Sequence, residues 1–187
     1  MTTDLDRLTA RLARAADDAG LLDVAVATAD SPVGPLLLAA TREGLVRVAY
    51  TNEDHAAVLQ SLADRISPRV LRAPDRLAPV VGQLEEYFAG RRTAFDLPLD
   101  LRLSAGFRRA VLTRLREVGY GTTASYAALA AAAGSPRAVR AVGTACATNP
   151  LPVVVPCHRV VRSDGALGNY VGGVAAKRTL LDLEAAA

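Results

Sequence analysis

Residues 122–148 read TTASYAALAAAAGSPRAVRAVGTACAT, and the fold prediction starts from this stretch. Its alanine-rich part predicts a helix over residues 122–133, with the two leading threonines as caps and Gly134 as its end. Ser135-Pro136 predicts a cap and a first-turn proline for a second helix, which runs to the end of the stretch. Two short helices joined by a tight glycine turn are typical of a helix-turn-helix.

The second predicted helix has one polar face. Its members are Arg137, Arg140, Thr144 and Thr148. The core side is expected to hold Ala138, Val139, Val142 and Ala145, and the small Ala141 and Gly143 keep the remaining surface low. Such a helix can lie close to a nucleic-acid backbone, with arginines that neutralise or probe it. An ordinary amphipathic helix with solvated arginines would have the same pattern.

Further elements are predicted on the N-terminal side of this stretch. Apolar spacing predicts a helix from Ser104 to Gly119, and before it helices over residues 4–18, 51–66 and 79–89. Three short apolar segments predict an antiparallel meander over residues 24–28, 35–40 and 45–50, and residues 95–101 are expected to be an extended linker. We therefore expect an α+β protein with a small antiparallel-sheet lobe at residues 1–103 and a mainly helical domain at residues 104–187.

Charge is distributed unevenly between these two halves. Residues 1–103 hold 12 Arg against 15 Asp and Glu, a net charge of −3, whereas residues 104–187 hold 9 Arg and 1 Lys against 4 acidic residues, a net charge of +6. A basic half is expected where a protein meets a polyanion. An arginine-rich composition without functional meaning would give the same imbalance.

Composition excludes several classes of protein. The 187 residues are 51% hydrophobic, with a mean hydropathy of +0.20, which excludes a disordered chain. The two cysteines are too few for a disulfide framework and fit a reducing cytosol, and with two distant histidines they form no metal site. The acidic N-terminus does not have the features of a signal peptide, and no apolar run is long enough to span a membrane. We expect a cytoplasmic protein without a membrane partner, and a surface position without a role for His55.

The sequence NPLPVVVPCHRV at residues 149–160 holds the candidate reactive group. Three prolines give this segment an irregular path, and Cys157 stands directly before His158 and Arg159. Cationic or hydrogen-bonding neighbours favour the thiolate, which is the reactive nucleophile. A lone cysteine is otherwise a small buried hydrophobe, and consecutive side chains on an extended strand point to opposite faces.

Glu184 provides a second indication of chemistry. It shares the predicted apolar face of the last helix with Leu180 and Leu181, where a carboxylate is costly unless it is paired. A buried Glu184 beside His158 would orient the imidazole and help it take the thiol proton of Cys157, directly or through a water. A frayed, solvated glutamate near the chain end is the alternative.

The segment Pro156-Cys157-His158-Arg159-Val160 resembles the active-site motif of the O6-alkylguanine-DNA alkyltransferases, or methylated-DNA–protein-cysteine methyltransferases. The surrounding motifs are similar in order and spacing: Ser125-Tyr126, Arg140-Ala141-Val142-Gly143, Asn149-Pro150, Gly168-Asn169-Tyr170 and Gly172-Gly173. The resemblance is dense over residues 104–184, and residues 31–36 are similar to the family's more variable N-terminal lobe. It implies a ribonuclease-H-like fold for that lobe.

The resemblance implies a DNA repair protein that flips O6-alkylguanine, and with it O4-alkylthymine, out of duplex DNA and transfers the alkyl group once to its own cysteine. The catalytic residues it implies are Cys157, His158, Glu184, Asn149 and Tyr126. The residues expected to contact the minor groove are Arg140 as the inserted finger, Arg137, Thr144, Tyr126, Ala141 and Gly143. The expected pocket residues are Val160, Tyr170, Val171 and Asn169. No cofactor or metal is needed, because the thioether product forms by direct attack on the alkyl carbon.

Three positions depart from the family's pattern. Val171 stands where many relatives have serine or glycine, and its branched side chain is expected to narrow the pocket against bulky alkyl groups. Cys146 is not a usual position for the reactive thiol, and we expect it to serve in packing. Ala147-Thr148 lacks the basic residue found in many relatives, which is expected to lower DNA affinity modestly.

Other functions remain as alternatives. A damage-binding protein of the alkyltransferase-like kind flips lesions without repair, but such proteins lack the acceptor cysteine. A DNA-binding regulator would usually carry a sensor cysteine cluster or a second DNA-binding domain. A cysteine hydrolase would turn over, and the basic C-terminal half argues against it. We expect a monomer in solution with double-stranded DNA as its partner, and leave cooperative assembly on DNA open.

Overall fold

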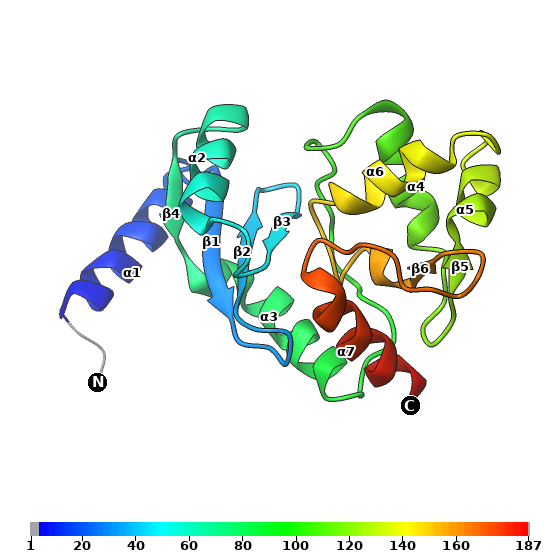
Figure 1. The fold of residues 1–187 in the computed structure, drawn as a ribbon. Helices are drawn as coiled ribbons and strands as arrows, with labels where there is room; N and C mark the ends of the chain where they lie inside the picture. Colours follow the sequence, from blue (N-terminus) through cyan, green and yellow to red (C-terminus); the bar gives the residue numbers. More distant parts are fainter. Residues whose placement is uncertain (1–3, 187) are drawn as a thin grey trace.

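The computed structural model describes residues 4–186, which form two lobes (Figure 1). The N-terminal lobe consists of α1 (Asp4–Asp18), β1 (Val24–Ala29), β2 (Leu36–Ala40), β3 (Leu45–Ala49), α2 (His55–Arg65), β4 (Val70–Arg72) and α3 (Pro74–Phe88). The C-terminal lobe consists of α4 (Gly106–Leu115), β5 (Ala124–Ser125), α5 (Tyr126–Ala132), α6 (Val139–Ala147), the 3₁₀ turn η1 (Cys157–Arg159), β6 (Val160–Val161) and α7 (Gly173–Ala185).

The N-terminal lobe is built on a four-stranded sheet with the order β3-β2-β1-β4. The antiparallel meander β1-β2-β3 is confirmed, with Ala27 opposite Leu38 and Leu38 opposite Val48. The sheet is mixed rather than purely antiparallel, because the three-residue β4 pairs parallel with β1. A strand this short carries too little alternation to be predicted from sequence. The α+β class is confirmed.

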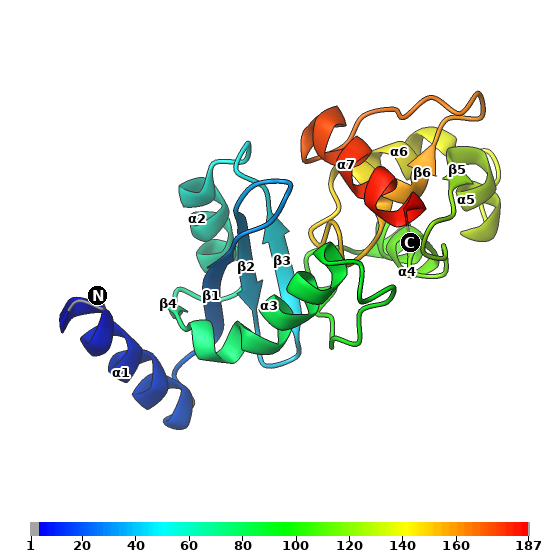
Figure 2. The ribbon, with the colours of Figure 1, turned by 90° about the horizontal axis from the view of Figure 1, so that it is seen from below.

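Helices cover both faces of this sheet (Figure 2). Leu62 of α2 packs on the face that carries Val26 and Val46. Leu77 and Leu84 of α3 belong to the larger core on the opposite face, which continues into the C-terminal lobe. The alternation of side chains along each strand therefore supplies two apolar layers.

The helix α1 has the predicted bounds, but Leu8 and Leu12 face solvent. Leu8 and Leu12 are each 59% exposed, whereas Ala13 is buried. An ion pair of Arg14 with Asp75 joins α1 to α3. The face of α1 that carries Ala13, and not the face with Leu8 and Leu12, therefore packs on the lobe.

The predicted linker at residues 95–101 is extended and runs along the outer edge of β3. Leu45 N donates to Pro98 O at 2.9 Å, and Asp100 N donates to Leu45 O at 2.8 Å. Gly44, with φ 142°, is required at this point because a Cβ would lie 2.2 Å from Pro98 O. The segment that joins the lobes thus also covers a sheet edge.

The C-terminal lobe contains the two short helices of the predicted helix-turn-helix, α5 and α6, but both begin later than predicted. Ser125 caps α5 by accepting from Ala128 N at 3.1 Å, whereas the two preceding threonines lie outside the helix. Ser135-Pro136 forms part of the turn, because Ala138 N donates to Ser135 O at 2.8 Å before α6 starts.

Three other helix predictions need correction. The helix α2 begins at His55, four residues after the predicted start, because Asp54 is the residue that caps it. The helix α4 covers only residues 106–115 and is shorter than predicted at both ends. The helix α3 begins at Pro74, five residues before the predicted start, because proline fits the first position of a helix. Pro79, which was predicted as the start, lies inside α3. Among residues 4–186, every helix is too short or too polar to cross a bilayer.

Candidate active site

A buried loop leads from α6 to η1 and ends at Cys157. Asn149 organises this loop: its Nδ2 donates to Val155 O at 2.8 Å and to Cys157 Sγ at 3.1 Å, and its Oδ1 accepts from Leu151 N at 3.0 Å. Val153 has φ 72°, a conformation that is strained for a β-branched residue. The fully buried surroundings hold this strained path and fix the position of the thiol.

The residue Cys157 is 2% exposed. Burial raises its pKa to about 11, although the Asn149 amide and the positive charge of Lys177 act in the opposite direction. A hydrogen-bonding and a cationic neighbour thus favour the thiolate, as expected, but burial outweighs both of them in the resting protein. The adjacent His158 and Arg159 both bond to a carboxylate rather than to the sulfur. The thiol is neutral at pH 7 and has to lose its proton before or during attack.

His158 and Glu184 form a buried pair, with Nε2 and Oε1 2.8 Å apart. Burial lowers the pKa of His158 below 6.5, and the carboxylate only partly offsets this. Burial raises the pKa of Glu184, but hydrogen bonds from His158 and Arg159 outweigh it and bring the pKa from 4.5 to about 2. A neutral imidazole that donates through Nε2 to an ionised carboxylate leaves Nδ1 as a proton acceptor, and Nδ1 has no hydrogen-bond partner among the described residues.

The carboxylate of Glu184 accepts four further hydrogen bonds. Arg159 donates through Nε to Oε2 and through Nη2 to Oε1, both at 2.9 Å. The hydroxyl of Tyr87 donates to Oε1 at 2.6 Å, and Gly121 N donates to Oε2 at 3.2 Å. Such saturation keeps the carboxylate ionised and its orientation fixed.

Sequence reasoning missed two buried polar residues of the site. Tyr87 shares the core side of α3 with Val80 and Leu84, so its spacing indicates packing alone. Lys177 is fully buried, and its Nζ donates to Val160 O at 2.6 Å and to Leu167 O. Its position three residues before Leu180, on the apolar face of α7, could have indicated a buried cation.

The predicted pocket residues border the same region. Three of them lie in the loop between β6 and α7: Asn169, Tyr170 and Val171. The Tyr170 ring lies edge-on to His158, with centroids 6.3 Å apart, and Asn169 is exposed. Val160 is fully buried directly after η1. Tyr126, at the start of α5, lies so close to this loop that a Cβ on Gly168 would be 3.0 Å from its hydroxyl.

The helix-turn-helix presents the predicted polar face to solvent. Arg140, Ala141 and Thr144 of α6 are exposed, and Gly143 is half-buried. Arg137 is exposed in the turn before α6 and not on the helix, and Val139, predicted to face the core, is 37% exposed. The later start of α6 leaves Arg137 outside the helix and makes Val139 its first residue, whereas Val142 and Ala145 are buried as predicted.

Cys146 lies on the opposite, buried side of α6. Burial raises the pKa of its thiol to about 12, so this cysteine is a poor nucleophile at neutral pH. Both cysteines are free thiols. No group of three or more potential metal-ligating side chains occurs within residues 4–186.

The fold and the site together define a class: a helix-turn-helix protein with a buried cysteine beside a histidine–glutamate pair. Comparison with known proteins agrees with this class. Residues 24–101 match the family model described as "6-O-methylguanine DNA methyltransferase, ribonuclease-like domain", and residues 106–186 match "6-O-methylguanine DNA methyltransferase, DNA binding domain". The chain therefore belongs to the 6-O-methylguanine DNA methyltransferase family.

Individual relatives are similar over most of their length. A methylated-DNA–protein-cysteine methyltransferase of Mycobacterium tuberculosis is 40% identical over 157 residues, which cover 84% of this chain and 90% of the relative. The constitutive enzyme of Bacillus subtilis is 38% identical over 161 residues, which cover 84% and 93%. The crystal structure of M. tuberculosis OGT in complex with DNA matches with a TM-score of 0.76 at 38% identity, covering 88% of this chain and 94% of that one.

Proposed function

We propose that this protein repairs O6-alkylguanine in double-stranded DNA by one irreversible transfer of the alkyl group to Cys157. The observation that carries the proposal is the position of the Cys157 thiol, held by Asn149 and next in the chain to a buried His158–Glu184 pair, in the same lobe as the helix-turn-helix. The solved DNA complex of the M. tuberculosis relative supports DNA as the partner.

An alkylated guanine inside a duplex is out of reach of a buried thiol, so the nucleotide has to be flipped out. The exposed face of α6 is small at Ala141 and Gly143, which suits a close approach to the minor groove. Arg140 is the side chain proposed to fill the space left in the duplex, with Arg137 and Thr144 on the DNA backbone. Tyr126 is proposed to contact the flipped nucleotide, because it borders the pocket loop at Gly168.

In the proposed transfer, the sulfur attacks the alkyl carbon, the new C–S bond forms and the C–O bond to guanine breaks. The bonding electrons stay with guanine, which takes up a proton. The thiol proton passes through a water to Nδ1 of His158, the free acceptor of the neutral ring. Glu184 stabilises the resulting imidazolium through Nε2. No described group can cleave the thioether, so each molecule reacts once.

The remaining parts of the proposal concern the pocket and the setting of the protein. Val160, Asn169, Tyr170 and Val171 would enclose the flipped base, with O4-alkylthymine as a second substrate. Residues 1–103 would act as the supporting lobe and residues 104–187 as the DNA-binding and acceptor domain. A reducing cytoplasm suits the function, because it keeps both thiols free. We propose a monomer in solution.

Mass spectrometry of the intact protein and its peptides tests this function. We expect incubation with duplex DNA carrying one O6-methylguanine to add a single methyl group to the peptide with Cys157, saturating at one per protein. Cys157→Ala is expected to bind the same DNA without any mass change. Cys146→Ala is the matched control, because it removes the other buried thiol, and we expect it to be methylated as the wild type is. Lesion binding by wild type without a mass change would make the protein a damage sensor and contradict the proposal.

A further inference from the structure

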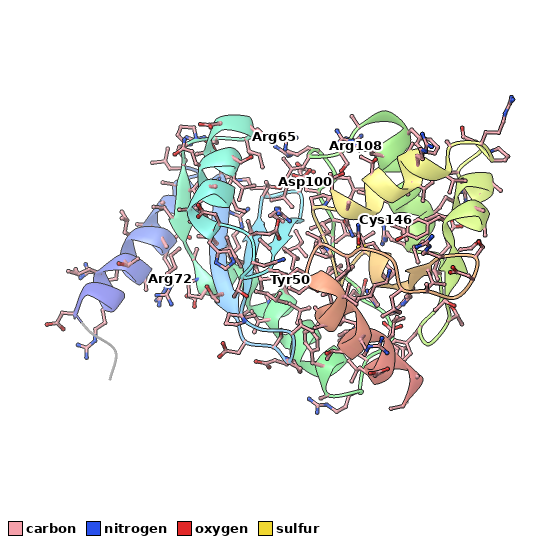
Figure 3. The ribbon with its side chains drawn as sticks, viewed as in Figure 1. Tyr50, Arg65, Arg72, Asp100, Arg108 and Cys146 are labelled. Carbon is pink, nitrogen blue, oxygen red and sulfur yellow. The ribbon has the colours of Figure 1, made fainter. Side chains whose placement is uncertain are left out.

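A side chain of the N-terminal lobe reaches the candidate pocket. Tyr50 follows β3 directly, is 2% exposed and points toward the C-terminal lobe (Figure 3). Its hydroxyl lies 2.9 Å from the hydroxyl of Tyr170, and the two rings meet edge-on with centroids 5.8 Å apart. A residue of the sheet lobe thus contacts the residue whose ring lies against His158.

Tyr50 is itself held rigidly. Its backbone N donates to Glu53 Oε1 at 3.0 Å, and its carbonyl oxygen lies 3.0 Å from Nε2 of His55. His55 is therefore half-buried and in contact with Tyr50, whereas the sequence predicted a surface residue without a role. The other oxygen of Glu53 pairs with Arg47, which also donates to Pro150 O at 3.3 Å. The Arg47–Glu53 pair that fixes Tyr50 therefore also contacts the loop that leads to Cys157.

The contact between Tyr50 and the pocket loop leaves no free space. A Cβ on Gly172 would lie 2.7 Å from the Tyr50 ring, although the backbone of Gly172 has an ordinary conformation. A second hydrogen bond joins the lobes nearby, from Asn52 Nδ2 to Val171 O at 2.9 Å. The N-terminal lobe therefore determines how far this loop stands from the acceptor cysteine.

We propose that Tyr50 is a specificity-determining positioning residue, which holds Tyr170 and its loop against the pocket and so limits the size of the alkyl group that reaches Cys157. The proposal rests on the proposed alkyl transfer. Tyr50 acts through Tyr170 and takes no part in the chemistry. Loss of the Tyr50 hydroxyl frees the Tyr170 ring to move. The pocket then has room for a larger alkyl group, but it positions a small alkyl group less well for attack.

Rates of methyl and benzyl transfer from otherwise identical duplexes test the proposal. For Tyr50→Phe we expect the ratio of the benzyl rate to the methyl rate to rise by about threefold to tenfold, the factor that corresponds to one neutral hydrogen bond. DNA affinity is expected to stay unchanged, since Tyr50 is buried and lies outside the helix-turn-helix. Gly172→Ala, which forces the loop and the ring apart, is expected to change the ratio in the same direction.

Two control variants separate positioning from loss of stability. Thr41→Val removes another buried hydroxyl of the same lobe, which bonds to Asp100 at 2.6 Å, and we expect it to lower stability without changing the ratio. Gly82→Ala adds a methyl group in open space and controls for Gly172→Ala. A ratio that stays at the wild-type value in Tyr50→Phe, or that moves equally in Thr41→Val, overturns the proposal. Wild-type protein that transfers no alkyl group contradicts the proposed function instead.

Discussion

Cys157 combines a buried, neutral thiol with a neighbouring base that is neutral as well. Burial raises the pKa of the thiol to about 11 and lowers the pKa of His158. Neither group is charged at pH 7, so the resting site avoids the cost of an uncompensated buried charge. The ionised Glu184 is compensated by Arg159. Reaction then requires the thiol proton to move when the alkyl carbon is in place.

The pH dependence of the transfer rate follows from these pKa values. A base is active when it is unprotonated, so the rate is expected to fall as pH drops below the pKa of His158, which itself lies below 6.5. Above that pKa the rate should stay level until the thiol ionises near pH 11. Single-turnover rates on a methylated duplex between pH 5 and about 9 would measure this profile.

His158→Gln is expected to lower the rate by about a hundredfold or more and to remove the acid limb, because glutamine cannot accept the proton. A wild-type rate that rises steadily between pH 7 and 9 would indicate direct reaction of a solvent-ionised thiolate and contradict the assignment of His158 as base.

At the scale of elements, α6 carries a glycine, Gly143, at an interior position where helix stability alone would favour alanine. Gly143 costs an interior helix about 1 kcal/mol relative to alanine. Nothing lies within 4 Å of the position that its Cβ would occupy, so the structure does not need glycine for packing. The close approach of α6 to DNA that we propose would account for a glycine at this position.

Gly143→Ala is therefore expected to raise the free energy of unfolding by about 0.5–1 kcal/mol and at the same time to weaken binding to duplex DNA. Urea denaturation and equilibrium binding to a methylated duplex measure the two effects. Gly82→Ala, on α3 and also without close neighbours, should show a stability gain of the same sign without the loss of affinity. Equal DNA affinity of the Gly143→Ala variant and wild type would mean that this side of α6 does not approach the duplex.

The elements were predictable to the extent that their signal is local. The helix-turn-helix and the meander follow from short-range spacing, and both occur in the structure. The first residues of α5 and α6 could not be predicted from this local signal. Ser125 and the two threonines before it are all good caps, and the pairing of β5 with β6 decides which of them begins α5. The segment before α6 has Ser135 and Pro136 at a plausible helix start, but the backbone forms a turn there before the helix begins.

At the scale of the whole molecule, the two lobes share one buried network. Tyr87 of α3 and Glu184 of α7, 97 residues apart, are joined by a 2.6 Å hydrogen bond, and Tyr87 also lies 3.5 Å from Nε2 of His158. Val48 N of β3 donates to Pro150 O of the active-site loop at 2.8 Å. The site therefore depends on both lobes being docked.

We expect the lobes to unfold together. A buried polar network that spans them is lost only as a unit, so urea denaturation followed by far-UV circular dichroism and by tyrosine fluorescence should give one coincident transition. Tyr87→Phe is expected to lower the free energy of unfolding by about 1 kcal/mol, the typical loss of one buried hydrogen bond, and to keep the transition single. Two separated transitions in the wild type would show that the lobes are independent.

The sequence by itself indicated the candidate reactive group, because two of its members are neighbours in the chain. Cys157 beside His158, and a carboxylate at Glu184 on an apolar helix face, indicated a reactive group with a paired acid, because a buried carboxylate is costly unless it is paired. The residues alone also allowed an inert cysteine and a solvated glutamate, and the family resemblance decided between these interpretations. The family resemblance followed from the same residues.

Three-dimensional packing decided the rest. The protonated state of the thiol results from burial, which adjacency in the chain does not report. The partners Tyr87, Lys177 and Tyr50 were hidden, because an aromatic or a lone lysine in a core pattern has the same spacing as a packing residue. The contact of Tyr87 with Glu184 spans 97 positions of the chain, and the contact of Tyr50 with Tyr170 spans 120. Both arise only when the lobes dock, since they depend on the path of the whole chain and not on any local preference.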